Sequence, residues 1–450
     1  MCEFSAGKPE VYILYSERRC IMEKRKLIVI SIDSMVTEDL EIIRQMPHMG
    51  KLLERSSIIR RNLTTYPSYT HSIHTSISTG CYPGTHGVIG NEHFDPGNME
   101  PEWFEKATDV KVPTLIQEAR KHGYTAAEVY WPLTLGDDAE WNIHRAGIHV
   151  IPENEQEIIC QRSKPGFFDE VYPYIKDSFK LHKYYKGDEL CFDTAEYLIG
   201  KYQPDVMYLH LVCIDYLRHN YGVFSKELWT GYEYLDKGFA RILKALKDQG
   251  LENRTIINVT SDHGHLDIRR VYSINRFLRD HGFITVDENG GLADWTAYFH
   301  TCSLSGHLYI KNHDPEVAGK VISLLKEHAG ELNIEKFYTR EEVKEKYHLD
   351  GDFDYVLESF GNASFSSDFN AELVQDTNNA SYRSSIATHG HEPYKGVQPT
   401  YFLYNPYSRR KVDLPQGRII DQAPTLARLL GFEMTTCDGS PIEELLEEGE

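Results

Sequence analysis

The sequence lacks the features that mark several large classes of protein. Its eight cysteines are scattered and none belongs to a CxxC pair, so neither a disulfide framework nor a zinc site built from thiolates is expected. It has no apolar run of about 20 residues, the length that crosses a bilayer. Residues 1–22 do not have the pattern of a secretory signal. We therefore expect a cytoplasmic protein that has no membrane partner.

Basic residues are also scarce relative to acidic ones. The 450 residues include 48 Lys and Arg but 68 Asp and Glu, and the formal net charge is −20. Such a surface repels polyanions, which argues against duplex nucleic acid and anionic membranes as partners. A small anionic substrate would need positive charge at its binding site, and bound metal ions are one source of it. The sequence does not indicate an oligomeric state.

Three apolar segments have the pattern of buried strands in a parallel sheet. They are residues 26–33 (KLIVISID), 206–215 (VMYLHLVCID) and 254–262 (RTIINVTSD), and each of them ends in an aspartate. Amphipathic helical segments lie between the strands; one has Pro113 near its start, and a later one follows Asp314. This alternation predicts an α/β fold, with a mostly parallel central sheet and helices on both faces.

The chain divides into parts of different character. Residues 1–22 precede the first strand and are interpreted as an N-terminal extension, with Met22 as an alternative start. Residues 23–266 and 389–450 carry the α/β pattern and form the predicted core. Residues 267–388 mix short strands, charged helices and a polar, loop-like segment. This mixture predicts a smaller inserted α+β cap.

Aspartate and histidine side chains are predicted to gather at one edge of the sheet. Ligands of open parallel sheets bind at the carboxyl ends of the strands, where the three aspartates lie. Two of the aspartates have a histidine nearby, and the segment THGHEP is a further source of imidazole. The candidate ligands are Asp33, Asp215, His219, Asp262, His263 and either His389 or His391. Carboxylates and imidazoles are zinc-type ligands, and six suffice for two ions with three protein ligands each.

Each motif alone has a simpler interpretation, because an aspartate after a strand often caps a turn or helix. The order of the motifs, however, resembles that of a known family. The first aspartate, the hydroxyl-rich segment 63–91, DYLRH, SDHG (residues 261–264) and THG follow one another in an order that resembles that of the alkaline phosphatase superfamily. The most similar branch is that of the type I phosphodiesterases/nucleotide pyrophosphatases, with phosphonoacetate hydrolase as a near neighbour. The resemblance covers residues 26–264 and 387–450.

The resemblance implies an alkaline phosphatase-like core with two metal ions. The ligands would be Asp215, His219 and His389 for one ion, and Asp33, Asp262 and His263 for the other. In this family a threonine between the ions is the nucleophile and is itself a metal ligand. An asparagine downstream of it binds a phosphoryl oxygen.

The family spacing selects Thr70 as the nucleophile. Family members end the nucleophile helix with Thr-Gly, here Thr79-Gly80, and the nucleophile lies ten residues before that glycine. Asn91 then lies at the family position of the asparagine. Thr65, in TTYP, mimics the nucleophile sequence of the nucleotide pyrophosphatases but lies five residues too early. Thr70 would begin a helix whose N-terminus favours negative charge; a simple helix-capping role is the alternative.

Other side chains of this region are given supporting roles. Three histidines do not match ligand positions and are expected to be structural or to contact ligands; they are His71, His74 and His86. Three aromatic residues are candidates to stack on a nucleobase, with a place in the core as the alternative; they are Tyr66, Tyr69 and Trp131.

The expected function is that of a hydrolase with two divalent ions, zinc first, with manganese or iron as alternatives. It would cleave phosphodiester or nucleotide pyrophosphate bonds in a small anionic phosphoester or nucleotide, through a covalent phospho-threonine at Thr70. The neutral amide of Asn91 favours a diester, since alkaline phosphatases place an arginine on the dianionic monoester. The alternatives are a phosphonate or phosphomonoester hydrolase, and a binding protein that metal ions only stabilise.

Overall fold

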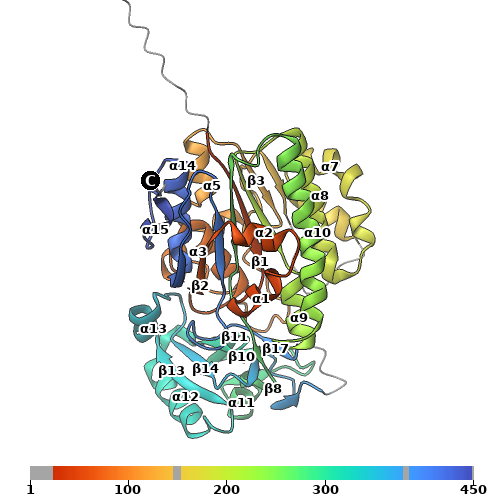
Figure 1. Cartoon of the computed structure of the whole chain (residues 1–450). Helices are drawn as coiled ribbons and strands as arrows, with labels where there is room; N and C mark the ends of the chain where they lie inside the picture. Colours follow the sequence, from red (N-terminus) through yellow and green to blue (C-terminus); the bar gives the residue numbers. More distant parts are fainter. Residues whose placement is uncertain (1–23, 145–153, 379–384, 448–450) are drawn as a thin grey trace, which may run out of the picture.

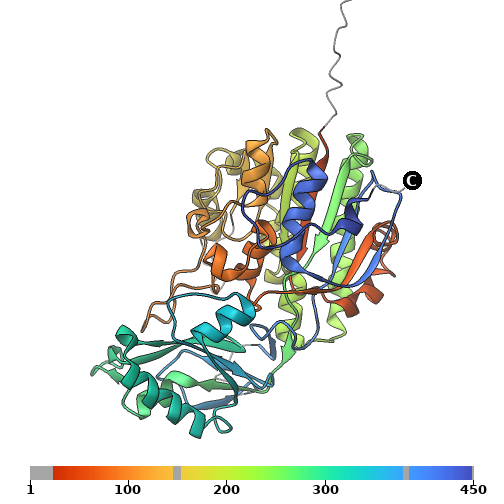
Figure 2. The same cartoon turned by 90° about the vertical axis from the view of Figure 1, so that its left-hand side faces the viewer.

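The computed structural model describes residues 24–144, 154–378 and 385–447, so the expected N-terminal extension lies outside the described residues. A large α/β part lies above a smaller sheet-and-helix part in the view of Figure 1. Helices cover both faces of the large sheet, as Figures 1 and 2 show from two sides. The predicted α/β class with a mostly parallel sheet is confirmed. Within the described ranges, no helix combines the length and apolar character needed to cross a membrane.

Eight strands form the central sheet, in the order β19-β2-β18-β6-β1-β5-β3-β4. Their bounds are β1 Lys26–Ile32, β2 Ser57–Leu63, β3 Ala126–Val129, β4 Trp141–Ile143, β5 Val206–Leu211, β6 Thr255–Thr260, β18 Tyr401–Tyr404 and β19 Asp413–Arg418. The strands from β6 to β4 run parallel to one another, whereas β18 is antiparallel to both of its neighbours. The parallel strands therefore place their carboxyl ends at one edge of the sheet.

Side chains of β1 alternate between two hydrophobic cores. Leu27 and Val29 belong to one core, and Ile28, Ile30 and Ile32 belong to the other. The helices are α3 Thr70–Thr79, α5 Leu115–Lys121 and α14 Gln422–Leu430 on the first side, and α8 Lys183–Lys201 and α10 Glu227–Asp248 on the second. Successive side chains of a strand point to opposite faces. The uninterrupted apolar run of β1 is thus explained by burial of both of its faces.

The helices follow the sequence signals with two differences. Asp314 caps α12 (Pro315–Glu327) as predicted, and its carboxylate accepts two backbone hydrogens. Pro113, however, lies outside α5, whose cap is the next residue, Thr114. Asp215 does not end a strand, because β5 stops at Leu211 and the aspartate lies in the first turn of α9 (Cys213–Tyr221). Cys213 and Ile214, which begin α9, are buried like the strand before them, and an apolar run alone does not separate the two structures.

The smaller part is an antiparallel sheet in the order β11-β12-β14-β13, with helices packed on it. Its main elements are α11 Ile274–Asp280, β11 Ala297–Cys302, β12 Ser305–Ile310, β13 Ile334–Thr339, α13 Arg340–Tyr347 and β14 Tyr355–Ser359, together with α12. The expected boundaries at 267 and 388 fall on β7 (Leu266–Asp267) and β17 (Ala387–Thr388), which pair with each other. The chain therefore leaves and re-enters the larger part at one place.

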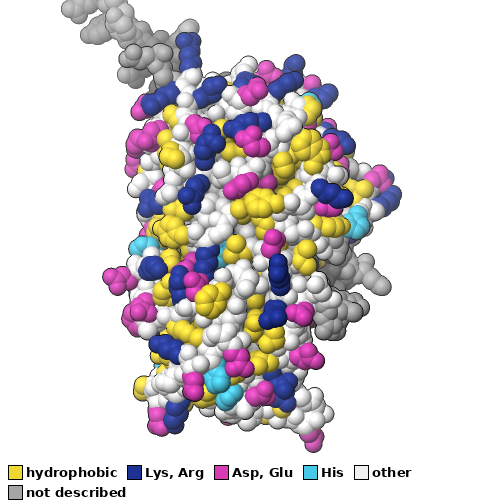
Figure 3. All heavy atoms as spheres, turned by 60° about the horizontal axis from the view of Figure 1, so that its bottom comes forward, with side chains coloured by type: hydrophobic (Ala, Val, Ile, Leu, Met, Phe, Trp, Pro, Cys, Tyr) yellow, Lys and Arg dark blue, Asp and Glu magenta, His cyan; other side chains and the backbone are white. Residues whose placement is uncertain are grey.

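Buried contacts hold this cap against the core. Tyr66 of the core donates a hydrogen bond of 2.9 Å from Oη to Glu358 Oε2 on β14, and Lys395 Nζ donates one of 2.8 Å to Glu358 Oε1. Phe94 stacks on Tyr309 of β12 with ring centroids 3.6 Å apart. The end of the molecule formed by the cap shows acidic, basic and hydrophobic side chains interspersed (Figure 3). The net negative charge is therefore not gathered on that face.

Buried histidines make the fold sensitive to acid. Burial lowers the pKa of His86, His144 and His307 to about 3 each, whereas an unfolded histidine titrates near about 6.5. Between these values the unfolded chain binds protons that the folded chain excludes. The free energy of unfolding is therefore expected to fall as the pH drops from about 6.5 toward 3, by about 1.4 kcal/mol per pH unit for each histidine.

Urea unfolding of the metal-free protein at about pH 7, 6 and 5 measures this slope. His307 stacks on Phe353 in the smaller part of the molecule. His307→Gln is expected to reduce the slope by about one proton. If the free energy of unfolding depended on pH equally in the variant and the parent, the lowered pKa of His307 would be contradicted.

Candidate active site

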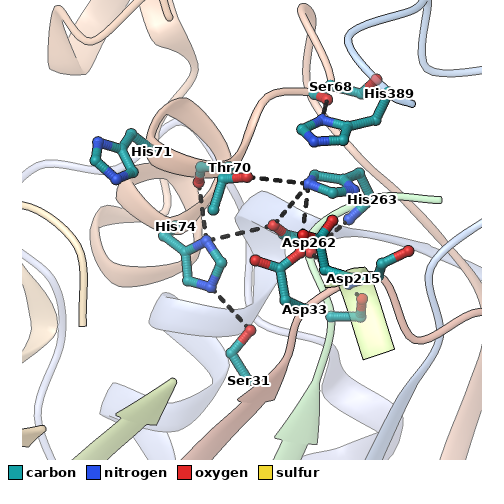
Figure 4. Close-up of polar contacts among 12 residues, drawn as sticks. Ser31, Asp33, Ser68, Thr70, His71, His74, Asp215, Asp262, His263 and His389 are labelled. Atoms are coloured by element: carbon teal, nitrogen blue, oxygen red, sulfur yellow. Dashed lines mark hydrogen bonds and ion pairs between the residues drawn. The ribbon is translucent and has the colours of Figure 1, made fainter. Parts of the chain in front are cut away.

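Asp33, Asp262 and His263 lie together where β1 and β6 end (Figure 4). The two strands are parallel neighbours, with Ser31 opposite Thr260, so the residues that follow them emerge side by side. His263 Nε2 lies 3.1 Å from Asp262 Oδ2 and 3.5 Å from Asp33 Oδ1. One donor atom from each residue lies within 4.8 Å of the others, which suits three ligands of one ion. These three residues are called the Asp33 group.

Neighbouring groups orient both carboxylates. Asp262 Oδ1 accepts backbone hydrogens from Ser34 at 3.1 Å and from His263 at 2.9 Å, which turns Oδ2 toward the rest of the group. His210 on β5 lies with Nε2 3.0 Å from Asp33 Oδ2, which leaves Oδ1 on the side of His263. Contacts of this kind determine the direction in which a carboxylate offers its remaining oxygen to a metal ion.

A second group of possible ligands adjoins the first and consists of Asp215, His219, His265 and His389. Asp215 and His219 lie on one face of α9, and Asp215 Oδ1 is 3.3 Å from His219 Nε2. His389 follows β17, and its ring stacks on that of His263 with centroids 3.6 Å apart. These four residues are called the Asp215 group. The six ligands expected from the resemblance thus lie in two adjoining groups, divided as the resemblance implies.

The sequence left a choice between His389 and His391, and His389 is the one that belongs to the Asp215 group. His389 Nδ1 donates a hydrogen bond of 2.9 Å to the carbonyl of Ser68. His219 Nδ1 likewise donates one of 2.8 Å to the carbonyl of Ala387. Each ring therefore carries its proton on Nδ1 and keeps Nε2 available as a ligand atom.

His265 is the site residue that the sequence reasoning missed. Its Nε2 lies 3.3 Å from Asp215 Oδ1, and it follows His263 by two residues in the segment SDHGH. A Cβ atom on Gly264 between them would lie 2.3 Å from the carbonyl oxygen of Val397, so only glycine lets the chain pass there. The signal that could have indicated it was a further histidine in a motif that already contained two expected ligands, Asp262 and His263.

The electrostatics of the two groups are those of a site that binds cations. Burial, together with the charge of Asp215, raises the pKa of Asp262 to about 7. Burial lowers the pKa of His389 to about 3 and that of His263 well below its ordinary value. Burial opposes protonation of His219 as well, but the Asp215 carboxylate outweighs it and raises the pKa. Crowded carboxylates beside neutral imidazoles fit divalent ions, whose charge would favour the ionised carboxylates.

Thr70 begins α3 and faces the Asp33 group in Figure 4. Its Oγ1 lies 3.2 Å from His263 Nε2, so the hydroxyl is adjacent to the ligands. The N-cap residue of α3 is Tyr69, and the hydroxyl of Ser72 donates to the carbonyl of Val88. Neither Thr70 nor Ser72 is therefore the helix cap. The start of α3 directs backbone N–H groups and a partial positive charge toward this place.

Asn91 lies beside the same helix start. Its Oδ1 accepts the backbone hydrogen of His71 at 2.9 Å, which leaves the amide nitrogen as a donor. Thr65, the alternative nucleophile considered from the sequence, instead has Oγ1 3.3 Å from Ser76 Oγ inside the core. Thr70 and Asn91, but not Thr65, are therefore placed at the start of α3 next to the ligands.

The other histidines of this segment lie outside both groups. His74 Nδ1 donates to the carbonyl of Thr70 at 2.8 Å, and its Nε2 accepts from Ser31 Oγ at 2.9 Å. These bonds tie the first turn of α3 to β1. His71 lies on the far side of Thr70 from the carboxylates in Figure 4, and His86 lies 3.0 Å from Ser76 Oγ. They hold the helix and the following loop in place.

Among the three aromatic candidates for base stacking, Tyr66 and Trp131 belong to the core. Tyr66 is fully buried and bonded to Glu358, and Trp131 is buried with an edge-on contact to His74. Tyr69 is half-buried, with its ring centroid 5.2 Å from that of His389. Tyr69 is therefore the candidate of the three that lies next to the ligands with part of its side chain exposed.

A profile of the family described as "Type I phosphodiesterase / nucleotide pyrophosphatase" matches residues 27–394. The chain belongs to this family, which confirms the resemblance seen in the sequence. An uncharacterised pyrophosphatase/phosphodiesterase of Schizosaccharomyces pombe is 24% identical over 230 residues, covering 48% of this chain and 40% of the relative. Human ectonucleotide pyrophosphatase/phosphodiesterase family member 1 is 23% identical over 250 residues, covering 52% of this chain and 23% of the relative. The chain thus matches less than half the length of either relative.

Solved structures share the fold. An inactive variant of murine ectonucleotide pyrophosphatase/phosphodiesterase 5 in complex with AMP superposes with a TM-score of 0.65 at 18% identity, covering 94% of this chain and 100% of that one. The human protein of the same name gives a TM-score of 0.64 at 16% identity, covering 94% and 99%. At such identities the likeness concerns the fold, and it agrees with the expected alkaline phosphatase-like architecture.

Proposed function

We propose that this protein is a hydrolase that uses two divalent ions to cleave phosphodiester or nucleotide pyrophosphate bonds through a covalent phospho-threonine at Thr70. The observation that carries the proposal is the position of the Thr70 hydroxyl, 3.2 Å from His263 Nε2, at the start of a helix and beside two groups of buried ligands. Family membership supports the same reaction class. The metal ions, when bound, would lower the pKa of the nucleophile and stabilise charge on the leaving oxygen.

Residues of the chain would take the following parts in the reaction. Thr70 Oγ1 loses its proton to solvent and attacks phosphorus, so that an O–P bond forms on one side while the bond to the leaving oxygen breaks on the other. The leaving oxygen takes up a proton, and water then cleaves the Thr70 ester to restore the hydroxyl. Asn91 and the backbone N–H of Thr70 would hold the other phosphoryl oxygens as their charge increases.

Charge favours a phosphodiester over a monoester as the substrate. A dianionic monoester is typically bound by an arginine, whereas the expected position here is occupied by the neutral amide of Asn91. Arg218 is a buried cation of this region, but it donates to Asp39 and to the carbonyls of Ser34 and Val223. The AMP complex of the murine structural neighbour supports a nucleotide as the group that is transferred or released. Tyr69 is then the proposed stacking surface for a base.

Kinetics with simple phosphate esters would test this order of substrates. Protein loaded with Zn²⁺ is expected to have a higher kcat/KM for bis(p-nitrophenyl) phosphate than for p-nitrophenyl phosphate or phosphonoacetate. A panel of nucleoside triphosphates and dinucleotides would then extend the series, and elemental analysis would identify the native metal. A clear preference for the monoester or for phosphonoacetate would replace the proposal by one of the two alternatives.

The cytoplasmic location expected from the sequence remains a proposal. Among the described residues, no cysteine forms a disulfide, which is compatible with a reducing compartment. Fractionation of cells that produce the protein from its natural gene, followed by detection with an antibody, would test the location.

A further inference from the structure

His265 has no place in the six-ligand set expected from the sequence, yet it is fully buried within the Asp215 group. Its ring centroid lies 4.4 Å from that of His219 and 5.0 Å from that of His389. A buried imidazole among two other imidazoles and a carboxylate would ordinarily carry a hydrogen bond on each nitrogen. The contacts of its two nitrogens therefore decide its role.

The distances match those between neighbouring ligands of one ion. Asp215 Oδ1 lies 3.3 Å from His219 Nε2, an expected ligand, and also 3.3 Å from His265 Nε2. Atoms bound at about 2.0–2.1 Å to a tetrahedral ion lie roughly 3.3–3.4 Å from one another. The distance from Asp215 to His265 is therefore the same as the distance from Asp215 to the expected ligand His219.

The hydrogen bonds of His265 favour direct ligation over a supporting contact to the carboxylate. Nδ1 lies 2.7 Å from Ser34 Oγ, whereas Nε2 has no hydrogen-bond partner among the described residues. Asp215 Oδ1 lies 3.3 Å from Nε2 but not in hydrogen-bond geometry, so a proton on Nε2 would be buried without a hydrogen bond, which is unfavourable by about 1–3 kcal/mol. Nδ1 therefore carries the proton and donates it to Ser34. The lone pair of Nε2 is left for an ion.

The backbone around Ser34 and Gly264 fixes this arrangement. Ser34 has a φ of 65°, an uncommon conformation for a residue other than glycine. Its N–H donates to Asp262 Oδ1 while its Oγ contacts His265, so one residue orients a ligand in each group. Gly264 passes the carbonyl of Val397 too closely for any other side chain. His263 and His265 are thereby directed to different groups, although only Gly264 separates them in the chain.

We propose that His265 is a fourth protein ligand of the ion bound by the Asp215 group, an inference that rests on the proposed two-metal function. This ion then has three imidazoles and one carboxylate around it, whereas the Asp33 group offers one imidazole and two carboxylates beside Thr70. Because the Asp215 group then supplies four protein ligands to this ion, a bound substrate or water would be its fifth ligand. The Asp215 group is expected to retain its ion more tightly than the Asp33 group, because it contributes one more protein ligand and more nitrogen donors.

Cobalt-loaded protein allows the ligands to be counted without any assay of activity. X-ray absorption of the wild-type protein with both sites filled is expected to show four bound imidazoles for two ions, and three in His265→Gln. Titration with Co²⁺ is expected to show that His265→Gln weakens the tighter site by about 100-fold or more, since changes to mere supporting contacts already weaken binding by about 10- to 100-fold. In the wild-type protein, a chelator is expected to remove the ion of the Asp33 group first.

His391→Gln is the matched control, since His391 is equally buried on the segment that carries His389 but lies outside both groups. This variant is expected to keep four bound imidazoles and both affinities. Ser34→Gly, which removes the hydroxyl but keeps the N–H and suits the positive φ, is expected to weaken the tighter site while keeping four imidazoles.

The experiment distinguishes failure of the ligand role of His265 from failure of the two-metal function. A count of three imidazoles in the wild-type protein would overturn the role of His265 and leave the two-metal function standing, and this result does not depend on folding of any variant. A protein that binds no divalent ion, or only one, would overturn the proposed function itself.

Discussion

Thr70→Ala is expected to lower kcat for bis(p-nitrophenyl) phosphate by about 10⁴-fold or more, because the variant lacks the oxygen that we propose forms the covalent bond to phosphorus. Fold and metal content are expected to be retained. The Thr70 side chain is bonded to His263 Nε2, but the backbone of α3 is held by other residues, among them His74. Steady-state kinetics, circular dichroism and elemental analysis of the purified variant would measure the three quantities together.

Thr65→Ala is the matched control for this prediction. Thr65 is a buried threonine on the same segment, and its hydroxyl contacts Ser76 in the core. Its removal is expected to reduce stability by about 1 kcal/mol while kcat changes by less than about tenfold. Equal losses of activity in the two variants would mean that Thr70 acts through packing. A Thr70→Ala protein with unchanged turnover would instead favour the binding protein that metal ions only stabilise.

The sequence was sufficient for the central sheet and for most of the site because the signals are local. The run from Lys26 to Ile32 is apolar on both faces, which occurs where helices cover both sides of a sheet. Asp33 and Asp262 follow neighbouring parallel strands, so their proximity follows from the strand assignment alone. His263 lies at the same place because it directly follows Asp262 in the chain.

The sequence was insufficient where a residue reaches the site by a less regular path. Asp215 was assigned to the end of a strand, but it lies on α9 four residues beyond β5. His265 reaches the Asp215 group because Gly264 allows a close approach to Val397, a residue more than one hundred positions away. Contacts of this kind depend on tertiary packing, and a single sequence has no periodic signal for them.

Asp262→Asn is expected to remove the ion of the Asp33 group while preserving the local structure. Asparagine can still accept the hydrogen bonds that Ser34 and His263 donate to Oδ1. The amide nitrogen that replaces Oδ2 has no lone pair available for a metal ion, so the group keeps two of its three ligands. The metal content is expected to fall from two ions to one. The value of kcat is expected to decrease by a factor on the order of 10³ or more.

The same substitution is expected to have opposite effects on stability with and without metal. Burial and Asp215 raise the pKa of Asp262 to about 7 in the metal-free protein, so the ionised carboxylate destabilises the fold at about pH 8, above that value. The neutral amide removes this penalty, and metal-free Asp262→Asn should unfold at the same temperature as the metal-free parent or higher. With Zn²⁺ present the order should reverse, because the parent gains binding energy from both ions. Near pH 4 the advantage of the metal-free variant should disappear, since the parent is then largely protonated.

Thermal unfolding at about pH 8, with a chelator and with excess Zn²⁺, would measure these effects. Asp236→Asn is the matched control: Asp236 is a buried aspartate whose Oδ1 accepts the backbone hydrogens of His48 and Met49, and it lies outside both groups. It should keep two ions and full turnover. If Asp262→Asn were less stable than the parent with chelator as well as with Zn²⁺, Asp262 would be a structural residue, and the Asp33 group would lose its standing as a metal site.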